Sequence, residues 1–164
     1  MKLDSLRKLY IHELKDLHSA ESQILNTMPR MIEAVSDKGL KKALQTHQKQ
    51  TERQVKRLEK IFGSLDARPG GHKCRGMEGL LREASDLLKA DAEPEVLDAA
   101  IVAATQRVEH YEMAGYGVAR TYAEKLGDYG AADLLQETLN EEANADQTLS
   151  RLAERRLNFE ALST

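Results

Sequence analysis

The middle of this 164-residue chain contains the run Val108-Glu109-His110-Tyr111-Glu112-Met113-Ala114-Gly115-Tyr116-Gly117, where two acids interrupt the apolar pattern of a helix. Apolar residues recur at roughly helical spacing on both sides of it, from Ala100 to Ala123. Glu109 and Glu112 are three positions apart, so they share one side of the helix, close to its apolar face. A charged pair at the edge of a core is costly unless something neutralises it. The two acids therefore point to neutralising partners.

The composition is typical of an all-helical protein. Charged residues make up 31% of the chain and aromatic residues 4%, and there are three prolines and no tryptophan. A chain of 164 residues can bury a sizeable core without disulfides, so we expect one domain over residues 1–164. The single cysteine, Cys74, excludes a disulfide within the chain and fits a reducing compartment.

The charge pattern argues against nucleic acid and membranes as partners. The net charge is -3 with both signs interspersed, and the sequence has no basic patch or lysine-rich tail. No run approaches the ~20 apolar residues of a membrane-spanning helix. Residues 1–8 include an acid at Asp4 and no following apolar block, unlike a signal peptide. We expect a cytoplasmic protein.

Apolar residues at helical spacing predict four long helices, over about residues 5–36, 40–62, 95–126 and 131–157. Tight breaks at 36–39 and 127–130 join them into two antiparallel hairpins. A long crossover, about 63–94, connects the hairpins and contains a short helix at 77–90. Two hairpins joined in this way predict an all-α, ferritin-like four-helix bundle.

Each long helix carries polar residues near its midpoint, and midpoints meet at one level in an antiparallel bundle. Five carboxylates would converge there, at a cost that exceeds the roughly 5 to 15 kcal/mol net stability of a domain. Bound metal ions, shared protons, or arginines such as Arg53, Arg107 and Arg120 could compensate them, and helical phase favours metal over arginine. The midpoint residues are Glu21, His47, Gln50, Gln54, Glu109, Glu112, Glu142 and Asp146.

A set of short segments also occurs in a characteristic combination. They are Asp16-Leu17-His18-Ser19-Ala20-Glu21-Ser22-Gln23, His47-Gln48-Lys49-Gln50-Thr51 with Gln54 and Arg57-Leu58, Lys73-Cys74-Arg75-Gly76-Met77-Glu78-Gly79-Leu80, Ala99 to Ala104 through Val108 to Glu112, and Leu139-Asn140-Glu141-Glu142 with Asp146. Over nearly its whole length the chain resembles the YciE/YciF-type ferritin-like proteins associated with bacterial stress responses. The resemblance implies a rubrerythrin-like bundle, a homodimer and a dinuclear metal centre, with a poorly defined activity.

The chain departs from the general di-iron pattern on two helices. That pattern has a Glu on two helices and Glu-x-x-His on the other two. Here Glu142 is followed three positions later by Ala145, and Gln50 by Arg53. A neutral amide is a weaker ligand than a carboxylate, so Gln50 weakens the case for redox iron chemistry.

The first functional hypothesis is a dimetal-carboxylate protein of the bacterial stress response that handles iron, oxygen or peroxide. It would hold two metal ions, with iron favoured over manganese or zinc, and its activity, if it has one, would be that of an oxidase or a peroxide-scavenging oxidoreductase. The second is a non-enzymatic stress or interaction protein with a degenerate metal site. A third, an iron-storage or DNA-protecting cage, requires a large hollow assembly. The candidate ligands are Glu21, His47, Gln50, Glu109, Glu112, Glu142 and Asp146.

Nearby residues receive other assignments. His110 is turned about 100° from Glu109, so we expect it to be exposed or to lie behind the ligands. Tyr111 and Tyr116 are expected to pack and to form hydrogen bonds. Glu137 and Glu141 are expected to be solvated.

Overall fold

The computed structural model describes residues 3–164, all of whose regular structure is helical. Met1 and Lys2, which begin the segment that lacks a signal-peptide pattern, lie outside the described residues. None of the helices in the described part has the length and apolar character needed to cross a membrane. The elements are α1 (Leu6–Ala34), α2 (Lys38–Ser64), α3 (Arg75–Leu87), α4 (Pro94–Lys125), α5 (Tyr129–Leu152), a π-helical turn (Ala153–Leu157) and α6 (Asn158–Leu162).

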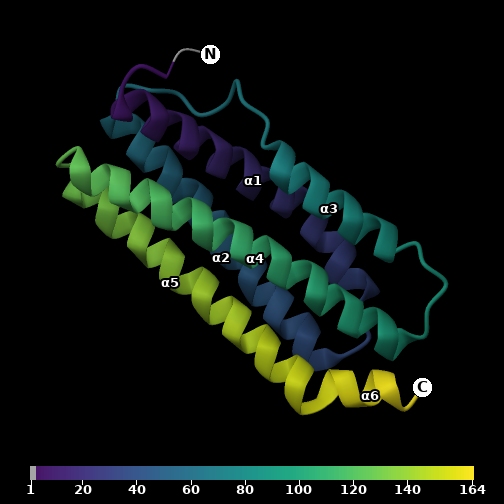
Figure 1. The fold of residues 1–164 in the computed structure, drawn as a ribbon. Helices are drawn as coiled ribbons and strands as arrows, with labels where there is room; N and C mark the ends of the chain where they lie inside the picture. Colours follow the sequence, from purple (N-terminus) through teal and green to yellow (C-terminus); the bar gives the residue numbers. More distant parts are fainter. Residues whose placement is uncertain (1–2) are drawn as a thin grey trace.

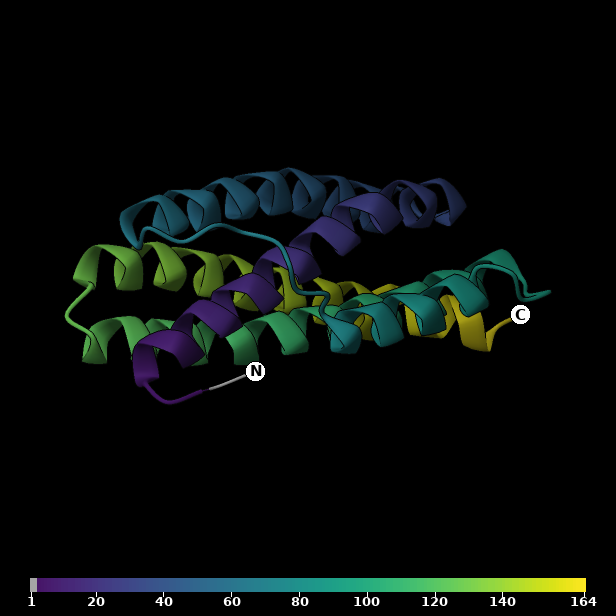
Figure 2. The same ribbon diagram turned by 90° about the horizontal axis from the view of Figure 1, so that it is seen from above.

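Four long helices form the bundle, as the sequence predicts (Figure 1). The hairpins α1–α2 and α4–α5 pack side by side, so that α1 contacts α4 and α2 contacts α5. The crossover loop, residues 65–74, lies along α1 (Figure 2): Arg7 Nη2 donates to the carbonyl of Leu65 at 2.9 Å, and the Cys74 amide donates to Ser19 Oγ at 2.9 Å. The α3 helix then packs on α1 and α4.

Capping groups fix the two tight turns. Asp37 accepts from the Leu40 amide at 2.7 Å, and the buried Asp98 of α4 accepts from the Asp37 amide at 2.8 Å. At the other end of the bundle Gly127 has a φ of 78°, a left-handed conformation that glycine adopts without strain and that ends α4. These contacts position the hairpins so that their helix centres face one another.

The helix boundaries differ from the predicted ones by one to three residues, and the end of the fourth helix differs by five. The α2 helix begins at Lys38 rather than Leu40, because the Asp37 cap precedes it. The short crossover helix begins at Arg75, since Cys74 Sγ accepts from the Met77 amide and caps it. The fourth helix was expected to continue regularly to about Leu157, but α5 ends at Leu152 and a π-helical turn follows. Pro29 lies within α1 and does not end it.

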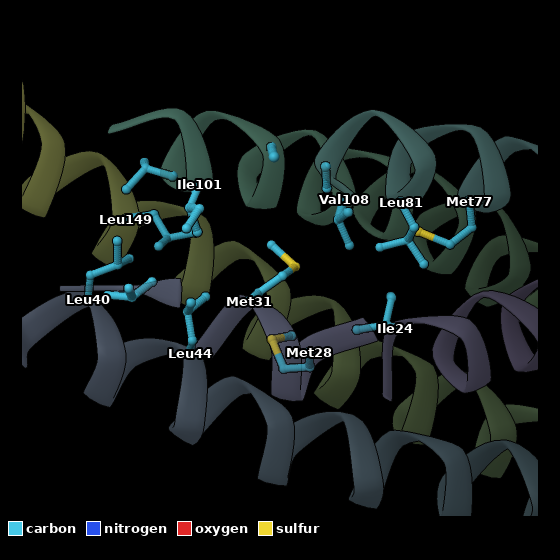
Figure 3. Packing of buried hydrophobic residues seen from close by; sticks show 14 of the residues in the cluster. Ile24, Met28, Met31, Leu40, Leu44, Met77, Leu81, Ile101, Val108 and Leu149 are labelled. Carbon is cyan, nitrogen blue, oxygen red and sulfur yellow. The ribbon is translucent and has the colours of Figure 1, made fainter. Parts of the chain in front are cut away.

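Two separate apolar clusters fill the bundle. One lies where α1 and α4 meet α3, together with the start of α2 and the end of α5, and Figure 3 shows its packing around Met28, Leu44 and Leu149. The other, which includes Leu14, Leu58 and Leu135, lies toward the opposite end of the four helices. The predicted polar layer lies between them, shielded from water at both ends.

Candidate metal centre

All four long helices contribute a buried polar side chain to the layer between the two apolar clusters. Glu21 comes from α1, Glu109 and Glu112 from α4, and Glu142 from α5, and each of these acids has an exposed fraction of 0%. His47 of α2 is 3% exposed. Ionised carboxylates are almost never fully buried unless a partner compensates their charge.

The ligand atoms of this group are close together. One atom each of His47, Glu109, Glu112 and Glu142 lies within 4.8 Å of the other three. His47 Nε2 is 3.3 Å from Glu109 Oε1, and His47 Nδ1 is 4.0 Å from Glu142 Oε2. Glu21 joins the group electrostatically, because its charge raises the pKa of Glu112 and that of Glu142 raises its own. A cation between these atoms would contact three or more of them.

Most of these atoms have no hydrogen-bond partner among the described residues. Both nitrogens of His47 and both carboxyl oxygens of Glu109 and Glu112 are unpartnered, as is one oxygen each of Glu21 and Glu142. A buried polar atom without a partner costs about 1 to 3 kcal/mol, and more if it is charged. A set of such atoms converging on one point is the arrangement expected of a cation site.

Without a cation, the acids would stay protonated at pH values well above those at which carboxyl groups usually ionise. Burial raises the pKa of Glu21, Glu109 and Glu112 well above 4.5, and the neighbouring carboxylates raise it further. Burial also lowers the pKa of His47, so its imidazole stays neutral and can act as a ligand. Protons and metal ions are therefore competing means of neutralising the same group.

Two polar side chains hold the outer oxygens of the acids. Tyr116 lies one helical turn beyond Glu112 on α4. Its buried hydroxyl donates to Glu21 Oε1. The buried Gln54 amide donates to Glu142 Oε1 and, at 3.1 Å, to Glu141 Oε2. Each bond leaves the second oxygen of the carboxyl group free to face the centre of the cluster.

Arginine does not neutralise the buried acids within residues 3–164. Arg53 is largely exposed, 3.5 Å from Glu141, Arg107 is exposed, and Arg120 pairs with Glu124 on its own helix at 2.7 Å. The arginine alternative is therefore wrong for the described residues.

Arg57, at the edge of the layer, was not among the arginines expected from the sequence to approach the acids. Arg57 donates to both oxygens of Glu141, at 2.7 and 3.1 Å, and also to Glu137. The expectation that Glu141 is solvated is wrong, since it is half-buried between Arg57 and Gln54. The signal was present in the sequence: Arg57 lies three positions after the inward Gln54, on a face shared with it.

The donor set fits first-row divalent metals. Carboxylate oxygens and a neutral imidazole suit iron, manganese and zinc, and ligand atoms of four of these residues already lie within 4.8 Å of one another.

The family model described as a domain of unknown function (DUF892) matches residues 5–162, nearly the whole chain. The chain belongs to this family.

Protein YciF of Escherichia coli strain K12 is 38% identical over 162 residues, 98% of each chain. The crystal structure described as the E. coli stress protein YciF superposes with a TM-score of 0.91, covering 95% of this chain and 99% of that one. A protein from Rhodopseudomonas palustris described as YcfI, a putative structural protein, is 38% identical with a TM-score of 0.88, over 91% and 95% of the two chains. A protein from Xanthomonas campestris shares the fold. It is 20% identical and superposes with a TM-score of 0.76, covering 92% of this chain and 93% of that one. The YciE/YciF resemblance and the ferritin-like bundle are thus confirmed.

Two candidate ligands of this DUF892 member lie at the edge of the layer. Gln50 is half-buried on the α2–α5 side. Asp146 is also half-buried; its Oδ1 accepts from Gln106 Nε2 at 2.9 Å and lies 3.3 Å from Nε2 of the exposed His110. The structure therefore brings together Glu21, His47, Glu109, Glu112 and Glu142 and places Gln50 and Asp146 outside them.

A second polar network lies behind α4 in this family member, between α1 and the crossover. The Tyr111 hydroxyl donates to Asp16 Oδ2 at 2.8 Å and lies 3.0 Å from Cys74 Sγ. His72 Nε2 is 2.7 Å from Asp16 Oδ1. The hydrogen bonds of Tyr111 and Tyr116 confirm the roles expected of them. This network ties α1, α4 and the crossover together beside the buried acidic layer.

Proposed function

We propose that the chain binds two divalent metal ions through Glu21, His47, Glu109, Glu112 and Glu142. The convergence of unpartnered, fully buried carboxylate and imidazole atoms carries this proposal. The four acids have a combined charge of −4 when ionised, which two divalent cations would balance. Gln50 and Asp146 are not included, because Asp146 is engaged by Gln106 and Gln50 lies at the edge of the layer.

Bound redox-active metal ions, iron or manganese, would supply electrons to oxygen or peroxide, whereas zinc would not. The protein's own residues have distinct roles in this proposal. Tyr116 orients Glu21, and Gln54 orients Glu142, each by donating to one carboxyl oxygen. The two apolar clusters exclude water from the layer and so strengthen each electrostatic interaction within it.

The relatives support a proposal for the biological setting. One solved relative is described as a stress protein, and we propose that this chain also serves a bacterial stress response in the cytoplasm, as a homodimer. Light scattering coupled to size-exclusion chromatography checks the assembly. A dimer supports the proposal, whereas a hollow assembly of many chains would favour the storage cage.

Metal analysis of protein purified without chelator and loaded with Fe²⁺ or Mn²⁺ tests the metal proposal. We expect about two ions per chain in the native protein and close to none in Glu112→Ala, which removes two converging oxygens. Glu52→Ala, an exposed position on α2, is the matched control and should keep the native stoichiometry. A native protein that stays free of metal after loading would refute the proposal.

A second candidate function is a structural role without turnover. The description of the R. palustris relative as a putative structural protein favours it, and shared protons could then neutralise the acids. Replacing a buried ionic group with an apolar one is often neutral or stabilising when it serves only the fold. Under this candidate Glu112→Leu would leave the free energy of unfolding unchanged or raised, and a clear fall that metal loading does not explain would count against it.

A further inference from the structure

A pocket opens on the side of the bundle where α2 faces α5. Its volume is about 310 Å³, and α4 forms its inner wall through Thr105 and Glu109. The side walls come mainly from small and apolar side chains of α2 and α5, two of which, Leu44 and Leu149, are labelled in Figure 3. These wall residues include Ala43, Leu44, Ala145, Thr148, Leu149 and Leu152.

The pocket reaches the buried cluster directly. His47 and Glu109 both line it, whereas Glu21, Glu112 and Glu142 do not. His47 and Glu109 are 3% and 0% exposed, and both nitrogens and both oxygens lack a hydrogen-bond partner among the residues described. The inner wall therefore presents unpartnered polar atoms at the end of a mainly apolar space.

The size of the pocket exceeds what oxygen or peroxide requires. A water molecule occupies about 30 Å³ in the liquid, and sites for organic ligands begin at about 300 Å³. A pocket of about 310 Å³ is in the range of an organic molecule of modest size. A diatomic or a peroxide alone would leave most of its apolar wall without contacts.

The charges favour an uncharged occupant. Two divalent ions, or protons in their absence, would neutralise the buried acids, so the inner end would offer no net charge to an ionic group. Lys42 is the one lysine or arginine among the lining residues, and it is exposed. A charged ligand would lose its hydration against the apolar walls with little compensation.

We propose that this pocket binds a small, uncharged, mainly apolar organic molecule and holds it against His47 and Glu109, beside the metal ions. The contact with metal rests on the proposed function, whereas binding in the pocket does not depend on metal. The apolar body would pack on Leu44, Ala145 and Leu149, and a terminal hydroxyl or carbonyl would face the unpartnered atoms.

Calorimetric titration with 1-hexanol tests the proposal, with hexanoate and hexylammonium as charged probes of the same length. We expect saturable binding of hexanol and at least tenfold weaker binding of both ions. Ala145→Phe should fill the pocket and weaken hexanol binding at least tenfold, whereas Ala143→Phe, at an exposed position on the same helix, should not change it. Ala43→Met, from the α2 wall, provides a second blocking variant if Ala145→Phe does not fold.

Metal content measured in the same samples separates this proposal from the metal proposal. Hexanol binding in metal-free protein would support the pocket even if the metal proposal failed. Metal-loaded protein that binds no hexanol, or binds it equally in both phenylalanine variants, would overturn the pocket proposal. Tighter binding of hexanoate would also overturn it, as it would show that Lys42 recruits an anion. If the native protein binds no probe and Ala145→Phe changes the oligomeric state, a second copy covers the pocket and the proposal fails.

Discussion

Tyr116 and Glu21 form the most directly testable pair of residues in the layer. Both are fully buried, and the phenol is the donor that satisfies Glu21 Oε1. This hydrogen bond favours the ionised form of Glu21, opposing the effect of burial on its pKa. The pair links α1 to α4 at the level of the proposed metal ions.

Replacing Tyr116 with Phe should destabilise the protein without changing its packing much. The substitution leaves Glu21 Oε1 buried and unpartnered, which costs about 1 to 3 kcal/mol. Urea denaturation of chelator-treated protein measures the change. Tyr129→Phe is the control, because Tyr129 is 69% exposed and should change stability by no more than about 0.5 kcal/mol. Equal effects of the two substitutions would contradict this role.

Helical phase explains why Gln54 and not Gln50 reaches the acids. His47, Thr51, Gln54 and Leu58 are all buried and recur at steps of three or four residues. At about 100° per residue, Gln50 lies about 70° from the centre of that stripe, toward α5. The sequence predicts a polar, amide-rich centre for this helix. The sequence alone does not show whether Gln50 or Gln54 contacts a carboxylate, since that depends on how α2 is rotated against its neighbours.

At the level of the helices, α1 and α4 approach closely at Gly115. A Cβ added to Gly115 would lie 2.7 Å from Leu17 Cδ2, well inside van der Waals contact. This glycine lies between Glu112 and Tyr116, so the close approach helps to bring Glu21 to its partners on α4. Gly117 of the same helix has open space around its Cβ position.

Alanine substitutions at these two glycines should have opposite effects. Gly115→Ala pushes the Leu17 side chain away and should destabilise the protein by about 1 to 3 kcal/mol. Gly117→Ala removes helix-destabilising backbone freedom without a clash and should stabilise it by about 0.5 to 1 kcal/mol. Thermal and urea denaturation measure both. A neutral or stabilising Gly115→Ala would show that the helices can separate at no cost.

Helix existence and order could be predicted from apolar periodicity, but the ends depended on individual capping contacts. Asp37 begins α2 because its carboxylate bonds Leu40, and Asp98 supports the same turn from α4, 61 positions away in sequence. The change from α5 to a π-helical turn has no signal in the apolar pattern, which continues to Leu157. Such long-range contacts are set by the assembled bundle.

On the scale of the whole molecule, the bundle consists of two apolar clusters separated by a buried acidic layer. The acids become costly once they ionise, because burial raises the pKa of Glu21, Glu109 and Glu112. A raised folded-state pKa means that the folded chain retains protons that the unfolded chain releases. Rising pH therefore destabilises the metal-free fold.

The free energy of unfolding of chelator-treated protein should fall between about pH 5 and pH 8. The contribution of the three acids is complete below their ordinary pKa of 4.5 and is lost as pH rises toward their raised values. The pKa of His47 is lowered by burial, so below its ordinary pKa of 6.5 this residue makes the free energy of unfolding rise with pH. The three acids outnumber this single group. Urea denaturation across this range measures the trend. Metal-free protein that gains stability toward pH 8 would contradict this picture.

Metal should reverse this dependence of stability on pH, because cations bind the ionised carboxylates and compete with protons.

The sequence predicts that the acids converge, since each lies near the midpoint of its helix. It could not show which atoms meet within 4.8 Å, or that Asp146 turns toward Gln106. Those outcomes depend on side-chain rotamers and helix rotation.

Anomalous scattering from crystals grown with Mn²⁺ or Fe²⁺ tests most directly whether this acidic layer holds metal ions. We expect strong anomalous peaks between His47, Glu109, Glu112 and Glu142, with one close to Glu21. Absence of any peak there in metal-saturated crystals, with the carboxyl groups hydrogen-bonded to one another instead, would contradict it.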